Sequence, residues 1–138
     1  MMTLHTYQLI HVLSPAQAKR LTELYQLEWW TCGRTLEQVT TMLAHSDQVF
    51  GLVTQDAELI GFTRVLSDYV FKALILDVIV VAEHRGEGLG RYLMEEVLGH
   101  SALAGVKHFE LYCLPEMVPF YESWDFAEDL QIKFLRRT

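Results

Sequence analysis

Cysteine is scarce in this chain, which has 138 residues and only two cysteines, Cys32 and Cys113. Two cysteines are too few for a disulfide scaffold, so both are expected to be free thiols in a reducing compartment. No apolar run is long enough to cross a bilayer, and the first residues lack the profile of a signal peptide. The sequence therefore predicts a cytoplasmic location and no membrane partner.

Basic residues are also few. The 11 lysines and arginines stand against 18 aspartates and glutamates, which gives a formal net charge of −7 and argues against nucleic acid as a partner. The six histidines show no metal-ligand spacing, so no metal is expected. The sequence holds no repeat, linker or low-complexity stretch, and 51% of its residues are hydrophobic. This composition predicts a single domain over residues 1–138 with a core of its own.

The order of expected elements indicates the fold class. Apolar runs and alternating patterns predict strands at about 4–12, 48–55, 58–67, 72–82, 107–114 and 130–135. Helices are expected to begin at Ser14-Pro15 and at Thr35, where cap residues precede apolar stripes. Further helices are expected at 88–103 and around Tyr121. We therefore expect an α/β protein of the α+β type, with a mixed, mostly antiparallel sheet of six to seven strands flanked by about four helices.

Three closely spaced glycines separate an apolar run from a helical pattern. Residues 85–90 read Arg-Gly-Glu-Gly-Leu-Gly, and they follow the run at 78–81. Glycines remove side chains where amides must approach a ligand, and a helix start offers unpaired N–H groups and the positive end of the helix dipole. Such a site most often binds phosphate, and Arg85 adds a fixed positive charge. The glycine spacing and position differ from those of dinucleotide folds and P-loops.

The order Arg-x-x-Gly-x-Gly, formed by Arg85, Gly88 and Gly90, resembles the acyl-CoA pyrophosphate loop of the GNAT (Gcn5-related N-acetyltransferase) superfamily. That pattern is Q/R-x-x-G-x-G/A. Farther along, Phe120-Tyr121 and the residues up to Phe126 look like the family's F-Y-x-x-x-G-F segment, with Asp in place of the usual last Gly. An Asp tolerates a left-handed backbone better than most residues, so a helix end is still expected there.

The resemblance implies that the chain binds acetyl-CoA or another acyl-CoA, and that it forms a homodimer. The diphosphate would lie on the loop amides, and the residues of this site would be Arg85, Gly86, Glu87, Gly88, Leu89 and Gly90. Arg85 would contact phosphate or shape the loop. The pantetheine arm would pair with the strand edge at Val78, Ile79 and Val80. The alternative is a strand–turn–helix junction whose glycines serve tight packing and bind no ligand.

Two residues are candidates for proton transfer. Tyr121 is the candidate general acid for the leaving thiolate, because a tyrosine with a pKa of about 10 stays protonated beside a thiol with a pKa of about 8.5. The alternative is a core tyrosine. Asp77, inside an apolar strand, is the candidate general base; its alternatives are an ion pair with Arg64 and a relay through ordered water. Cys113 has no adjacent basic residue to activate it, so we expect a buried small hydrophobe there.

In GNAT folds the segment between the first two helices covers the acceptor site. Trp29 and Trp30 would form an aromatic wall for an amine, and Arg34 would pair with a substrate carboxylate. The alternative is that one tryptophan lies in the core and the other in a dimer contact. We expect an enzyme, an N-acetyltransferase that acts on a primary amine of a small molecule by direct attack. The other class of function is a non-catalytic acyl-CoA-binding module that regulates a partner.

Overall fold

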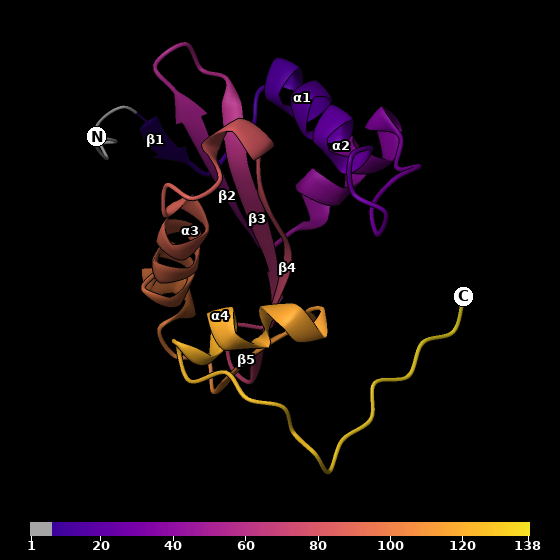
Figure 1. Cartoon of the computed structure of the whole chain (residues 1–138), viewed down its shortest axis with the longest axis vertical. Helices are drawn as coiled ribbons and strands as arrows, with labels where there is room; N and C mark the ends of the chain where they lie inside the picture. The colour runs from indigo at the N-terminus through magenta and orange to yellow at the C-terminus, as the bar shows by residue number, and fades with distance from the viewer. Residues whose placement is uncertain (1–6) are drawn as a thin grey trace.

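Five strands form one mixed sheet in the computed structural model, which describes residues 7–138 (Figure 1). The strands lie in their sequence order, and neighbours are antiparallel except for β4 and β5, which are parallel. Their bounds are β1 (Tyr7–Ile10), β2 (Gln48–Thr54), β3 (Leu59–Ser67), β4 (Lys72–Val80) and β5 (His108–Leu111). The predicted fold class is confirmed, with five strands in the described residues where six to seven were expected.

Local capping signals set where the first two helices begin. Ser14 caps α1 (Pro15–Tyr25) and Thr35 caps α2 (Leu36–His45), and both starts are capping boxes completed by a glutamine three residues later. The later helices are α3 (Leu89–Leu98) and α4 (Val118–Glu122), and short 3-10 turns are η2 (Ala82–His84), η3 (Ser101–Leu103) and η4 (Pro115–Met117). In Figure 1, α1 and α2 lie to one side of the sheet and α3 to the other.

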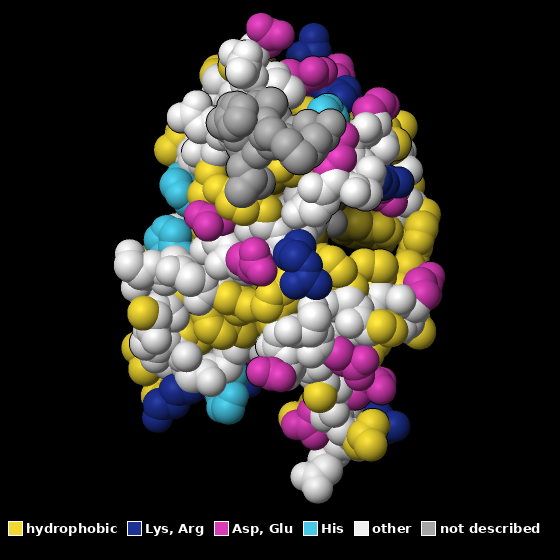
Figure 2. Space-filling model, turned by 60° about the vertical axis from the view of Figure 1, so that its left-hand side comes forward, with side chains coloured by type: hydrophobic (Ala, Val, Ile, Leu, Met, Phe, Trp, Pro, Cys, Tyr) yellow, Lys and Arg dark blue, Asp and Glu magenta, His cyan; other side chains and the backbone are white. Residues whose placement is uncertain are grey.

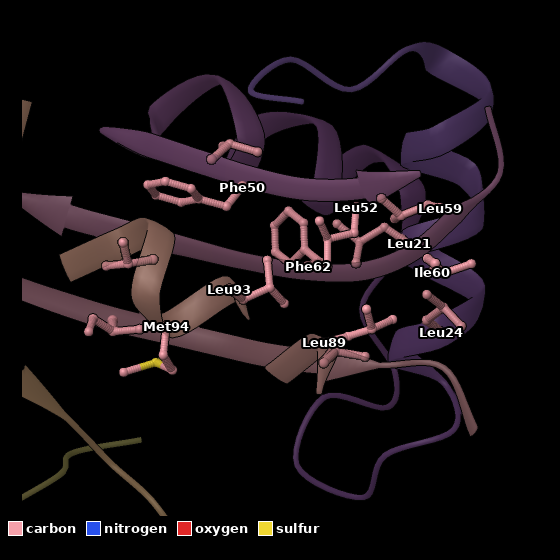
Figure 3. Packing of buried hydrophobic residues seen from close by; sticks show 14 of the residues in the cluster. Leu21, Leu24, Phe50, Leu52, Leu59, Ile60, Phe62, Leu89, Leu93 and Met94 are labelled. Atoms are coloured by element: carbon pink, nitrogen blue, oxygen red, sulfur yellow. The ribbon is translucent and has the colours of Figure 1, made fainter. Parts of the chain in front are cut away.

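The hydrophobic core lies between the sheet and these helices. Phe50 and Phe62 of the sheet are fully buried, as are Leu21 of α1 and Leu93 of α3. Figure 3 shows side chains from α1, α3 and the sheet packed together in this core. Within residues 7–138, no helix is both long and apolar enough to cross a membrane, and no group of three or more His, Cys, Asp or Glu side chains could hold a metal ion. The cytoplasmic location stays a prediction.

Three predicted elements differ in the structure. The helix expected over 88–103 stops at Leu98, because Gly99 caps it through its own N–H, and a 3-10 turn follows. The strand expected over 130–135 is not formed, and Leu130 and Ile132 are 85% and 68% exposed. The strand expected over 4–12 is shorter, Tyr7–Ile10, and residues 4–6 of that prediction lie outside the described residues.

The second half of β4 separates from β5. The two strands pair only from Lys72 to Ile75 of β4. The β3–β4 register then shifts, so that one extra residue of β4 stands opposite Thr63, and Asp77 takes a left-handed φ of +57°. In the described part of the chain, the end of β4 therefore has β3 on one side and no strand on the other.

Candidate active site

The glycine loop between β4 and α3 has the backbone that the sequence predicts. Gly86 and Gly88 have φ values of +82° and +83°, which residues with a side chain rarely adopt. A Cβ placed on either would meet no heavy atom within 4 Å, so the space above both residues is open. The glycines here serve a turn with an accessible backbone; tight packing around Gly86 and Gly88 does not account for them.

The amides of this loop are free to bind a ligand. No described residue accepts a hydrogen bond from the backbone N–H groups of Gly86 through Gly90. These donors lie at the start of α3, where the helix dipole favours negative charge. The one acidic side chain of the loop, Glu87, pairs with His84 at 3.0 Å. Five unpaired donors at the start of a helix form a suitable site for a phosphate or diphosphate group.

Gly90 has a different role from the other two glycines. Its Cβ would lie 3.5 Å from Phe120 of α4, an ordinary van der Waals contact, so this position borders α4 and not open space. Phe120 packs edge-on against Tyr121 and Trp124. The loop and the Phe-Tyr segment, which are thirty residues apart, are therefore in contact, as a shared site requires.

The free edge of β4 leads directly into the loop. The Val81 amide donates to the Ile60 carbonyl of β3, and neighbouring residues of a strand direct their backbone groups to opposite sides. The N–H and C=O of Val80 therefore point away from β3, toward the gap between β4 and β5. The Arg85 side chain donates from Nε to the Val80 carbonyl at 3.0 Å. This contact supports the interpretation that Arg85 shapes the loop.

Two arginines tie the segment between α1 and α2 to this end of β4. Arg85 pairs with Glu28 at 3.2 Å, and Arg34 pairs with Asp77 at 2.8 Å. The intervening Trp29 and Trp30 are 73% and 40% exposed, so the alternative that one of them lies in the core is wrong. The structure thus places two accessible indole rings in the segment that the resemblance assigns to the acceptor.

Asp77 is the centre of a buried polar cluster. Its Oδ2 accepts hydrogen bonds from the Tyr25 hydroxyl at 2.9 Å, from Arg34 Nη1 at 2.8 Å and from Arg64 Nε at 2.8 Å. The Asp77 side chain is 5% exposed, and the Arg34 guanidinium lies over the Tyr25 ring. The ion pair with Arg64, the structural alternative for this residue, is confirmed. Because Nη1 of Arg34 donates to Asp77, fewer N–H groups of the guanidinium are left to bind a substrate carboxylate.

The charge of this cluster opposes the use of Asp77 as a base. Burial alone would raise the pKa of Asp77, but the hydrogen bonds and positive charges of Arg34 and Arg64 outweigh burial and hold it below its ordinary value. A carboxylate with a lowered pKa is a weaker proton acceptor. The structure therefore favours a positioning role for Asp77, in which it fixes Arg34 and Tyr25 against β4.

We expect Asp77→Asn to destabilise the fold by about 3 kcal/mol, because the change leaves two arginines without their shared charge. Since the pKa of Asp77 is lowered in the folded state, its contribution is present above the unfolded pKa and is lost as the pH falls through the folded one. The acid limb of the stability curve should therefore flatten in the variant, measured by urea unfolding across pH. The exposed Asp56→Asn is the control, expected within about 0.5 kcal/mol. Equal stability of the two variants would contradict this account.

Tyr121 lies on α4 with its side chain mostly enclosed. The residue is 8% exposed and packs against Phe120 and Phe126. Burial, with a smaller effect from Cys113, raises the pKa of Tyr121 to about 12. No hydrogen bond of the described residues involves its hydroxyl, which is also not among the fully enclosed polar atoms without a partner. The hydroxyl is thus a protonated donor available to a ligand.

The structure corrects the expectation that Cys113 is buried. Both cysteines are free thiols, as predicted, but Cys113 is exposed and not buried, because it lies beyond the end of β5 where the chain has left the sheet. Partial desolvation, Glu128 and Glu116 raise the pKa of the Cys113 thiol. A raised pKa opposes its use as an acyl carrier.

Three contacts of this region were missing from the sequence interpretation. Tyr25 fitted the apolar stripe of α1, and nothing local marks its hydroxyl as the partner of a carboxylate 52 residues away. Nothing in the sequence around Glu28 indicates that its side chain pairs with Arg85. The contact of Phe120 with Gly90 could have been inferred, since both belong to motifs of the same resemblance.

The comparisons with known proteins agree with this geometry. The acetyltransferase (GNAT) family model matches residues 8–126. An uncharacterized N-acetyltransferase, ycf52, of Porphyra purpurea is 30% identical over 115 residues, which are 77% of this chain and 66% of that protein. Serotonin N-acetyltransferase 2, chloroplastic, of Oryza sativa subsp. japonica is 33% identical over 99 residues, 70% of this chain and 50% of the relative. The chain thus spans about half to two thirds of these relatives.

Solved structures agree as well. A protein of the GNAT family from Xanthomonas campestris pv. campestris superposes with a TM-score of 0.82 at 29% identity, over 96% of this chain and 93% of that one. A candidate acetyltransferase from Deinococcus radiodurans R1 superposes with a TM-score of 0.80 at 30% identity, over 99% and 92% of the two chains. From its sequence match, its fold and its glycine loop, this chain belongs to the GNAT acetyltransferase family.

Proposed function

We propose that this chain, as one domain, is an N-acetyltransferase that moves the acetyl group of acetyl-CoA to a primary amine of a small molecule. The observation that carries the proposal is the row of five unpaired amides from Gly86 to Gly90, which begins at the free edge of β4. The loop suits the diphosphate of the co-substrate, and the edge at Val78 to Val80 suits its amide-bearing arm. Both features belong to one continuous stretch of chain.

The reaction replaces a carbon–sulfur bond by a carbon–nitrogen bond. The amine nitrogen attacks the thioester carbonyl carbon, the sulfur leaves with the bonding electron pair, and one proton leaves the nitrogen. Tyr121, which a pKa of about 12 keeps protonated at neutral pH, donates a hydrogen bond and then its proton to the leaving sulfur, and it regains a proton from the water that receives the proton of the amine. The Val80 amide, directed into the gap beside β4, is the donor we assign to the carbonyl oxygen.

Water takes the proton of the amine in this proposal. Asp77 is not assigned this step, because Arg34 and Arg64 hold it as a carboxylate of lowered pKa. Alkyl ammonium groups must lose a proton before they attack, and we assign this proton to water at the free edge of β4. The acetylation rate should rise with pH as the acceptor amine is deprotonated.

The acceptor is proposed to lie against the segment between α1 and α2. Trp29 and Trp30 are accessible there, and their rings suit an amine with an apolar or aromatic body. The rice relative is named for serotonin, an amine of that kind, and it shares 33% identity over 99 residues with this chain. Aromatic amines are therefore the first class to test.

The decisive experiment is an amine screen with acetyl-CoA, in which the release of free CoA thiol and the acetylated product are both measured. We expect turnover with at least one primary amine, with aromatic amines favoured over polyamines. Trp29→Ala should raise the KM for that amine several-fold and leave the KM for acetyl-CoA unchanged. Tight CoA binding with no product from any amine would favour a non-catalytic acyl-CoA-binding module.

A further inference from the structure

The guanidinium of Arg85 lies between the two halves of the proposed site. Its Nε donates to the Val80 carbonyl at 3.0 Å, and its Nη2 pairs with the Glu28 carboxylate at 3.2 Å. Val80 belongs to the free edge of β4 that suits the pantetheine arm, and Glu28 directly precedes the two tryptophans proposed to contact the acceptor. One side chain therefore joins the cofactor edge to the acceptor segment.

Glu28 lies in a short protrusion, residues 27–30, between two buried residues. Tyr25 is fully buried and Thr31 is 2% exposed, and the Thr31 hydroxyl donates to the Tyr25 carbonyl at 2.8 Å. The residues of the protrusion itself are exposed or half-buried. Among the described residues, Arg85 is the one side chain from another part of the fold that hydrogen-bonds to the protrusion. Its ion pair with Glu28 thus tethers the protrusion to the glycine loop.

A bound diphosphate would compete with Glu28 for Arg85. The free amides of the loop begin at the next residue, Gly86, so a diphosphate on these amides would lie beside the guanidinium. Figure 2 shows Lys and Arg side chains scattered among Asp and Glu side chains over one face, without a continuous basic patch that could bind the phosphates instead. The Arg85 side chain is 59% exposed and has room to turn. A diphosphate carries more charge than one carboxylate, and charged oxygens accept stronger hydrogen bonds than a backbone carbonyl does.

We propose that Glu28 is a positioning residue that acts through Arg85. It holds the guanidinium on the Val80 carbonyl while the cofactor is absent, and it loses the guanidinium to the diphosphate when coenzyme A binds. The exchange frees the Val80 carbonyl to accept from an N–H group of the pantetheine arm, and it releases the protrusion on the acceptor side. The inference rests on the proposed function, because it takes coenzyme A as the ligand of the loop.

Calorimetric titration with coenzyme A tests the competition. Glu28→Gln should tighten binding about three-fold, the size expected of a partly exposed ion pair. In an Arg85→Gln background the same change should have no effect, because the competition requires the guanidinium. Loss of one negative charge near the diphosphate would by itself tighten binding in both backgrounds. Glu23→Gln, the same change at an exposed residue of α1, is the control and should leave the affinity unchanged.

Hydrogen exchange tests the release of the protrusion without reference to affinity. The amides of Thr31 and Cys32 donate to the Glu28 carbonyl at 3.2 and 2.9 Å, so their exchange reports on the position of the protrusion. In the wild type, saturating coenzyme A should speed their exchange about three-fold or more. In Glu28→Gln the exchange should already be fast without the ligand, and coenzyme A should change it little.

The outcomes separate this inference from the proposed function. Equal affinities of the wild type and Glu28→Gln, or an equal gain in both backgrounds, would overturn the inference and leave the proposed function intact. Slower exchange at Thr31 and Cys32 with coenzyme A would contradict it as well, because the protrusion would then close on the cofactor. Absence of coenzyme A binding by both the wild type and Glu23→Gln would instead refute the proposed function, and the inference with it.

Discussion

Gly88→Asp is expected to weaken coenzyme A binding by about 100-fold or more while the chain stays folded. The new carboxylate would project into the open space above the loop, where no atom of the described chain lies within 4 Å of a Cβ. Two like charges about 5 Å apart repel by roughly 3 kcal/mol at an effective dielectric constant of about 20, and each 1.4 kcal/mol is a factor of ten. Isothermal titration calorimetry with coenzyme A measures this loss.

The choice of residues isolates charge from backbone strain. Asp tolerates the φ of +83° at this position better than most side chains, so its cost to stability should stay near 1 kcal/mol. The matched control is Gly33→Asp, which adds the same carboxylate at another exposed glycine of positive φ, +93°, with open space around it. The control should bind coenzyme A like the wild type. Equal affinities of the two variants would place the diphosphate elsewhere.

Tyr121→Phe should lower kcat by about 100-fold or more, the usual contribution of a general acid, with little change in the KM for acetyl-CoA. Phenylalanine keeps the ring contacts with Phe120 and Phe126, and the hydroxyl has no partner within the described chain, so the fold should be unaffected. Steady-state kinetics and thermal unfolding together distinguish loss of chemistry from loss of structure.

The pH dependence adds a second check on Tyr121. Because its pKa is raised to about 12, the hydroxyl stays protonated across the pH range in which the enzyme is stable, and it should impose no alkaline decline of kcat below about pH 11. Tyr112→Phe removes a hydroxyl from an exposed tyrosine just past β5 and serves as the control. A kcat for Tyr121→Phe equal to that of Tyr112→Phe would identify Tyr121 as a core residue only.

Features set by neighbouring residues were predicted well from the sequence. The caps Ser14 and Thr35 act on amides three residues away, and the helix starts follow from them. The glycine loop is equally local, since positive φ values at Gly86 and Gly88 need no distant partner. The end of α3 was missed because the apolar pattern continues past Gly99, although that glycine caps the helix.

Features that depend on distant residues were not predictable in this way. Asp77 was recognised as a buried carboxylate, but its partners Tyr25 and Arg34 are 52 and 43 residues away and reach it only through the packing of α1 and the following segment against β4. Their charges reverse the pKa shift that burial alone implies. The strand expected at 130–135 has the right local pattern, yet no strand of the described chain pairs with it.

The most direct test of the acetyltransferase account is calorimetric titration of the purified wild-type chain with coenzyme A. Five free amides at the start of α3 predict one site per chain with a dissociation constant tighter than about 100 µM. Pantetheine lacks the diphosphate, so a titration with pantetheine in place of coenzyme A should lose most of the heat of binding. Absence of binding by coenzyme A, or equal binding by pantetheine, would contradict the assignment of the loop to a diphosphate.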